Sequence, residues 1–113
     1  MDKANDQIYV EHILQAIVGI ETFTRGLSFD DFTGDLKTQL AITRELEIIG
    51  EASKRLSPAF KSNLGNIPWK KITDMRNFLI HDYLDIDLEI VWKAATEDIA
   101  ELKHALEQAQ SEV

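Results

Sequence analysis

The stretch LEIVWKAATEDIAELKHALEQAQSEV, residues 88–113, carries the clearest structural signal in the chain. Its apolar residues recur at alternating intervals of four and three, which is the spacing of one face of an α-helix. Asp87 immediately precedes the stretch and is a suitable N-cap. We therefore expect a long amphipathic helix that buries one stripe, formed by Leu88, Trp92, Ala95, Ile99, Leu102, Leu106, Ala109 and Val113.

Three upstream segments show the same helical period: residues 4–26, 31–56 and 68–84. Gly26 is a suitable stop for the first, and Ser57-Pro58 ends the second because a residue before proline is pushed out of the helical region. We therefore predict an all-α fold, an up-and-down four-helix bundle with short loops. The apolar stripes upstream are Val10, Ile13, Ile17, Ile20 and Leu27, then Leu36, Leu40, Ile42, Leu46, Ile49 and Leu56.

Length and composition restrict the class of protein. The 113 residues are 44% hydrophobic, which suits one helical domain spanning residues 1–113. The absence of cysteine excludes disulfides and thiolate metal sites, and no apolar run is long enough to cross a bilayer. The N-terminus shows no secretion signal, so we expect a cytoplasmic protein without membrane contact. A net charge of −8 excludes broad coating of nucleic acid, and any RNA contact must be local.

The predicted helix at residues 68–84 contains an unusual arginine. At about 100° per residue, Arg76 falls in the middle of the apolar face. A guanidinium there needs a carboxylate partner, for which Glu51 is the first candidate and Glu47 the alternative. Gly50, Ala52 and Ser53 make this part of the second helix slim enough for close approach by another helix. The apolar face around Arg76 is formed by Trp69, Ile72, Leu79, Ile80 and Tyr83.

Polar residues that suit phosphate chemistry follow Arg76 closely. The same projection places His81 about 140° from Arg76, with Asn77 one turn before it. Phe78 projects away from the apolar face, which suggests a second, intermolecular interface. Arginine can bind a phosphate and histidine can move protons near neutral pH. An ordinary structural ion pair for Arg76 and a solvated His81 remain the alternative reading.

These residues also carry a resemblance to a known family. Arg76, His81 and Tyr83 form Arg-x4-His-x-Tyr, the signature of the HEPN superfamily. The blocks IGEA at residues 49–52, IPWKKI at 67–72 and DLEIVW at 87–92 resemble the HepT branch, the toxins of HepT/MntA toxin–antitoxin systems. Three blocks in the right order make a chance match implausible. The N-terminal 30 residues match only in helical character.

The resemblance implies a metal-independent ribonuclease toxin that acts on RNA as a homodimer, or a multiple of dimers, and needs no cofactor. Arg76 would clamp the phosphate, His81 would serve as base or acid, and Asn77 would orient His81 or a phosphate oxygen. Glu51 would support Arg76. The resemblance further implies that an MntA-like nucleotidyltransferase antitoxin transfers AMP to Tyr83 and silences the toxin.

Two other functions remain open from the sequence. One is a non-catalytic HEPN subunit that partners a nucleotidyltransferase and binds nucleotide or RNA without cutting it. The other is a helical dimerisation domain in which Arg76 is only an ion-pair anchor. For the ribonuclease, the acidic composition requires a small cationic cleft, which we expect from Arg76 with Lys70, Lys71 and Lys93. His12 and His104 have no neighbours at metal-ligand spacing, so we expect no metal site.

Overall fold

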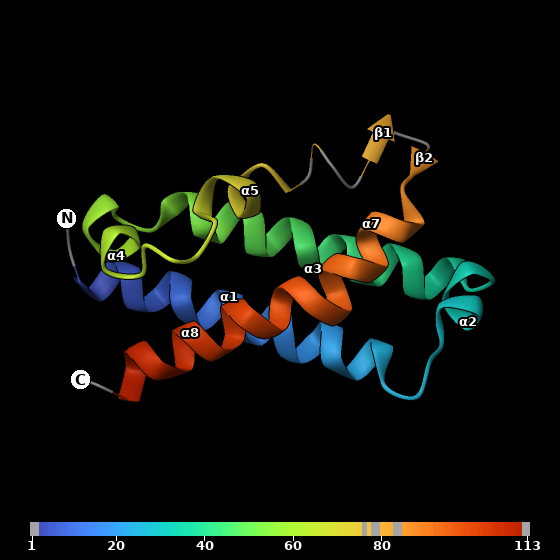
Figure 1. Cartoon of the computed structure of the whole chain (residues 1–113), viewed down its shortest axis with the longest axis horizontal. Coiled ribbons are helices and arrows are strands. Elements are labelled where there is room, and N and C mark those ends of the chain that lie inside the picture. Colours follow the sequence, from blue (N-terminus) through green and yellow to red (C-terminus); the bar gives the residue numbers. More distant parts are fainter. Residues whose placement is uncertain (1–2, 76, 78–79, 83–84, 112–113) are drawn as a thin grey trace.

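The computed structural model describes residues 3–75, 77, 80–82 and 85–111. Long helical rods lie side by side and form the body of the molecule (Figure 1). The first two are α1 (Lys3–Thr24) and α3 (Leu36–Arg55), which run antiparallel. The C-terminal rod consists of α7 (Leu88–Lys93), the π-helical turn η1 (Ala94–Asp98) and α8 (Ile99–Ser111).

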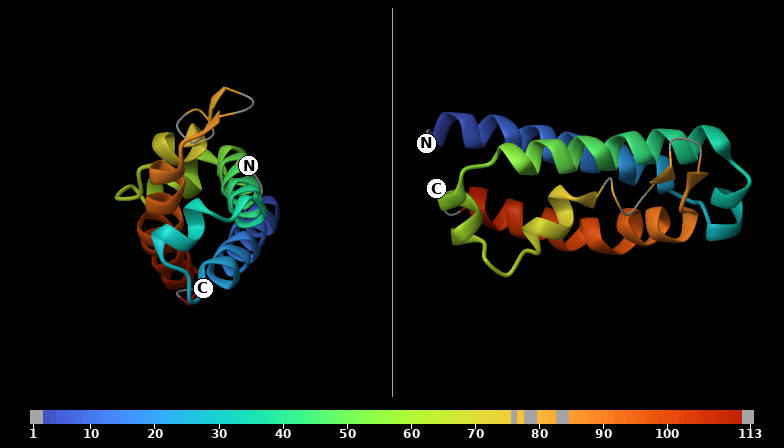
Figure 2. Two further views of the ribbon diagram at one scale, coloured as in Figure 1. Left: turned by 90° about the vertical axis from the view of Figure 1, so that its right-hand side faces the viewer. Right: turned by 90° about the horizontal axis from the view of Figure 1, so that it is seen from above.

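Short elements connect these rods. They are α2 (Phe29–Thr33), α4 (Pro58–Asn63) and α5 (Trp69–Thr73), with a two-stranded antiparallel hairpin of β1 (Ile80–Asp82) and β2 (Asp85–Ile86). The views in Figure 2 place α5 and the hairpin along one side of the rods. The predicted all-α helical bundle is confirmed, with short helices in place of a long third one.

The core lies between the three rods and contains most of the predicted stripes. Ile13 and Ile20 of α1 meet Ile42, Leu46 and Ile49 of α3, and all five side chains are fully buried. Leu36 and Leu40 were predicted to share the second stripe, but they are 64% and 53% exposed. Val91, Ile99, Leu102 and Leu106 complete the core from the C-terminal rod.

The π-helical turn η1 modifies the predicted stripe of the C-terminal rod. A π turn accommodates one extra residue, so the buried face shifts by one position along the helix. Val91 is therefore buried before the shift, and both Ala94 and Ala95 are buried within it. Trp92 is half-buried and packs on the Phe32 ring, with a centroid distance of 5.0 Å.

The prediction of one continuous helix over residues 31–56 is wrong. Ser28 begins α2 earlier through a capping box with Asp31. The helix ends at Gly34, and the Asp35 side chain caps α3 by accepting a hydrogen bond from the Thr38 amide. The buried Gln39 amide donates to the Phe32 and Thr33 carbonyls at 2.9 and 3.1 Å and so satisfies the end of α2.

The prediction of one helix over residues 68–84 is wrong at a turn after Thr73 and again from Ile80 on. The helix begins at Trp69 as expected and α5 ends at Thr73, but Met75 and Asn77 are helical again after the turn at Asp74, and the Asn77 amide donates to the Asp74 carbonyl. The backbone is extended again at Ile80, which pairs with Ile86 across the hairpin. Isoleucine favours extended backbone, and the apolar spacing of this short segment was not sufficient to specify a helix.

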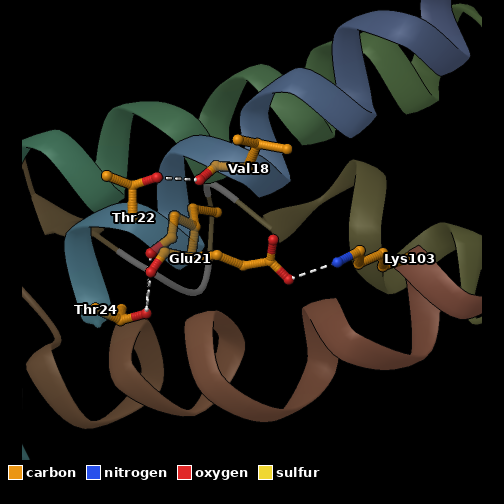
Figure 3. Close-up of polar contacts among 6 residues, drawn as sticks. Val18, Glu21, Thr22, Thr24 and Lys103 are labelled. Atoms are coloured by element: carbon orange, nitrogen blue, oxygen red, sulfur yellow. Dashed lines mark hydrogen bonds and ion pairs between the residues drawn. The ribbon is translucent and has the colours of Figure 1, made fainter. Parts of the chain in front are cut away.

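Polar contacts fasten the rods at both ends. The buried Asp6 carboxylate of α1 accepts hydrogen bonds from the Ser57 amide (2.8 Å) and hydroxyl (2.7 Å), where Ser57 also caps α4. At the other end of α1, Lys103 of α8 donates to Glu21 at 2.9 Å (Figure 3). This contact raises the pKa of Lys103 above its ordinary value. Within the described ranges, no helix is long and apolar enough to cross a membrane.

Candidate functional site

The approach of α5 to α3 positions the beginning of the motif. Gly50 of α3 faces the end of α5, and a Cβ atom added at Gly50 would lie 3.1 Å from the Ile72 carbonyl oxygen and 3.6 Å from that of Thr73. Only glycine allows this approach without a shift of the backbone. The small residues around Gly50 were predicted to let another helix approach closely. The approach of α5, the segment that leads into the motif, confirms this prediction.

The structure describes only part of the motif itself. Arg76 and Tyr83, predicted as phosphate clamp and modification site, lie outside the described residues. Asn77 is described and exposed. The His81 backbone belongs to β1, at the irregular position between the paired residues Ile80 and Asp82, while its side chain lies outside the description. The helical projection that related His81 to Arg76 therefore does not hold.

The carboxylates predicted as partners of Arg76 lie beside the end of α5. Glu47 and Glu51 line a pocket of about 290 Å³ together with Gly50, Arg44 and Thr73. Glu51 is exposed and Glu47 is half-buried. Because Thr73 is three residues from Arg76, both carboxylates lie near the entry to the motif. The choice between Glu51 and Glu47 as partner of Arg76 stays open.

Two of the lysines expected to form a cationic cleft are engaged with carboxylates. Lys70 of α5 contacts Asp74, the residue that follows this helix, at 2.9 Å, and Lys71 lies 3.8 Å from Asp98 of η1. Both lysines are largely exposed, so these pairs are weak and screened by salt. They nevertheless reduce the positive charge available to RNA on this side. Lys93 is exposed in the last turn of α7.

A second pocket, not predicted from the sequence, lies in the groove between α1 and α3. It has a volume of about 260 Å³ and is lined by Tyr9 and His12 of α1 and by Arg44, Ile48, Glu51, Ala52 and Arg55 of α3. Tyr9 and His12 are in edge-to-face contact, with ring centroids 6.1 Å apart. One sequence feature could have indicated this pocket: the helical spacing that places Arg44, Glu51 and Arg55 on one face of α3.

Glu45 of α3 is half-buried, in a less hydrated environment than the exposed residues around it. Burial raises the pKa of the Glu45 carboxyl above its ordinary value of 4.5, and the charge of Arg44 partly opposes this shift. The carboxylate lies over Gly19 of α1, where an added Cβ atom would be 2.5 Å from Glu45 Oε2. Glu45 thus belongs to the α1–α3 contact rather than to the pockets.

The described side chains include no cluster suited to metal coordination. No group of three or more His, Asp or Glu side chains that could hold a metal ion occurs among them.

A helical bundle that carries Arg-x4-His-x-Tyr defines a class of protein, the HEPN-type helical domain. The sequence model of one family, described as “Ribonuclease HepT-like”, matches residues 13–109. The chain belongs to this HepT-like family. It is 46% identical over 106 residues to a protein of Thermococcus cleftensis named “Probable ribonuclease HepT”, covering 94% of this chain and 96% of that one.

Further relatives carry similar names. A Caldanaerobacter subterraneus subsp. tengcongensis protein named “Putative RNase” is 39% identical over 100 residues, which cover 88% of this chain and 89% of the relative. A Methanocaldococcus jannaschii protein of the same description is 34% identical over 107 residues, covering 95% and 98%. No solved structure matches the chain at a significant level. The predicted family is therefore confirmed by sequence along nearly the whole chain.

Proposed function

We propose that this protein is a metal-independent endoribonuclease, the toxin of a toxin–antitoxin pair, which cleaves RNA at a site formed by two copies of the chain. The observation that carries the proposal is the family match over residues 13–109, which spans the Arg-x4-His-x-Tyr motif. The names of the relatives, which refer to ribonucleases, support the same activity.

The residues of the motif suit cleavage by attack of the ribose 2′-hydroxyl on the adjacent phosphorus. This reaction needs a base for the hydroxyl proton, an acid for the leaving oxygen and a cation for the developing negative charge. His81 serves as base or acid, and Arg76 binds the phosphate oxygens. Asn77, which is exposed within the motif, orients the phosphate or the imidazole.

The need for both a base and an acid favours a dimeric site. One chain contributes a single motif histidine, whereas a two-fold axis near the hairpin brings two His81 and two Arg76 residues to one cleft. The exposed Leu36 and Leu40 support such an assembly, because they lie four residues apart on one face of α3 and both remain uncovered in the single chain.

Regulation by a nucleotidyltransferase partner belongs to the same proposal. Transfer of AMP to the Tyr83 hydroxyl adds a phosphate charge and a bulky nucleoside two residues from His81. Both the charge and the bulk oppose binding of the RNA phosphate at that site. Incubation with the partner and ATP should increase the intact mass by one or more adenylate units, and Tyr83→Phe should prevent the increase.

The direct test compares RNA cleavage by the wild type and by His81→Ala in the presence of EDTA. We expect the wild type to cleave RNA with EDTA present, and His81→Ala to lose activity at least 100-fold while keeping its helical circular dichroism and its dimeric mass. Full activity in His81→Ala, or loss of wild-type activity with EDTA, would refute the mechanism.

One alternative is a HEPN subunit that binds RNA or nucleotide without cutting it. This alternative predicts RNA binding by the wild type without cleavage under any condition, and binding that survives His81→Ala.

A further inference from the structure

The groove between α1 and α3 offers free arginines in an otherwise acidic protein. Arg44 and Arg55 are exposed and line the same pocket. Among the residues that the structure describes, neither guanidinium forms an ion pair, unlike Lys70, Lys71 and Lys103. Their charge therefore remains available to an anion from solution.

The two arginines share one face of α3 with Lys37. At about 100° per residue, Lys37, Arg44 and Arg55 fall within roughly 20° of one line along the helix. At 1.5 Å per residue, the first two are about 10 Å apart and the last two about 16 Å. We call Lys37, Arg44 and Arg55 the α3 cationic row. Such a row matches an extended polyanion rather than a single small ion.

The groove is continuous with the surroundings of the motif. Arg44 and Glu51 line both the pocket against α1 and the pocket that reaches Thr73 at the end of α5. The two pockets therefore lie on either side of the row of α3 side chains that contains Arg44 and Glu51. Figure 1 shows α1 and α5 on different sides of α3, as this arrangement requires.

The other side chains of the groove suit a nucleic acid. Tyr9 and His12 provide aromatic rings at the α1 wall, on which an unpaired base can stack. Arginine binds phosphate oxygens in a bidentate manner that lysine cannot reproduce. Glu51 lies between the two arginines and repels phosphate, so the backbone must contact Arg44 and Arg55 and pass Glu51 without touching it.

We propose that the groove formed by Tyr9, His12, Arg44 and Arg55 binds the phosphodiester backbone of single-stranded RNA several nucleotides away from the cleaved bond. This inference rests on the proposed ribonuclease function and extends it by assigning a path to the substrate. It also resolves the difficulty of an acidic nuclease, because the affinity for RNA comes from a narrow row of cations rather than from the net charge.

The test measures binding of a fluorescein-labelled 15-nucleotide oligouridylate by anisotropy, in the His81→Ala background so that the probe stays intact. Arg44→Gln and Arg55→Gln should each raise Kd about 3- to 10-fold at low salt. The double variant should reduce the slope of log Kd against log salt concentration by about 1.4, since each lost single-strand phosphate contact contributes about 0.7.

Arg25→Gln is the matched control. Arg25 is exposed, and in the described part of the chain it lies in a different pocket, against Ala95 and Ile99 of the C-terminal rod. Its substitution removes the same charge and should change Kd less than 1.5-fold. Equal losses in Arg25→Gln and Arg44→Gln, unchanged binding in the double variant, or no binding of the probe by the His81→Ala parent would each overturn the inference.

Cleavage by the otherwise wild-type protein separates this inference from the proposed function. If cleavage is observed and the double variant binds RNA like its parent, the groove assignment is wrong and the proposed ribonuclease function stands. If no RNA is cleaved but the double variant loses binding, the nuclease fails and the groove stands.

Discussion

Substitution of Gly50 by alanine tests whether the contact between α3 and α5 positions the motif. The new Cβ atom would lie 3.1 Å from the Ile72 carbonyl oxygen, which belongs to the backbone and cannot rotate away. Either α5 or α3 must therefore shift by a few tenths of an ångström. Because α5 leads directly into the motif, the shift displaces the entry to the site.

The expected stability change is the difference between two effects. Alanine is favoured over glycine in a helix by about 1 kcal/mol. Overpacking against a fixed neighbour costs about 1–3 kcal/mol. Gly50→Ala should therefore destabilise the protein by about 0–2 kcal/mol, while RNA cleavage falls by at least 10-fold.

Gly19→Ala provides the matched control within α1. Its Cβ atom would meet Glu45 Oε2 at 2.5 Å, but a carboxylate at the end of a flexible side chain can swing into water. This variant should gain about 1 kcal/mol and retain full activity. At about 4 °C per kcal/mol, the melting temperatures of the two variants should differ by roughly 4–12 °C at equal protein concentration. Equal melting temperatures and equal activities would refute the reasoning.

Two further predictions concern charged groups in the contacts of α1. The raised pKa of Glu45 means that its ionised form is disfavoured in the folded state, so it lowers stability as pH rises above about 4.5. Glu45→Gln should therefore raise the melting temperature at pH 7, and the gain should shrink on acidification below pH 4.5; an equal gain in Glu97→Gln, at an exposed position, would contradict this. Asp6→Ala should cost about 2–3 kcal/mol in urea unfolding, because it leaves the buried amide and hydroxyl of Ser57 without their acceptor. A loss below 0.5 kcal/mol would show that the contact is not needed.

The long helices were predictable because their stripes are long and regular. Val10, Ile13, Ile17 and Ile20 in α1, and Ile42, Leu46 and Ile49 in α3, are buried as the helical period indicates. Asp87 caps the C-terminal rod through the Ile90 amide, as its position predicted. In both α1 and α3 the apolar period extends over several turns, so a single exception does not change the predicted helix.

The errors fall where local contacts decide the structure. The break at Gly34 depends on the Ser28 capping box, the Asp35 cap and the side chain of Gln39, none of which contributes to an apolar period. The hairpin at Ile80 and Ile86 interrupts a segment too short for its spacing to be decisive. The π turn that begins at Ala94 could not be predicted, because the apolar residues around it fit helical spacing with or without one extra residue.

The candidate site was predictable in its motif but not in its surroundings. Gly50 was expected to allow a close approach, and it does so against Ile72. The groove that contains Arg44 and Arg55 depends on how α1 packs beside α3, which no motif encodes. The roles of Arg76, His81 and Tyr83 remain predictions from the family and from their chemistry.

Mixing wild-type chains with inactive His81→Ala chains tests most directly whether two chains contribute to one catalytic site. When the two are unfolded together and refolded, each mixed dimer carries a single motif histidine in the shared cleft and so lacks either the base or the acid. Cleavage per wild-type chain should therefore fall in proportion to the fraction of wild-type chains in the mixture. Mixed dimers that form, as shown by native mass, while each wild-type chain keeps its full cleavage rate would contradict a shared site.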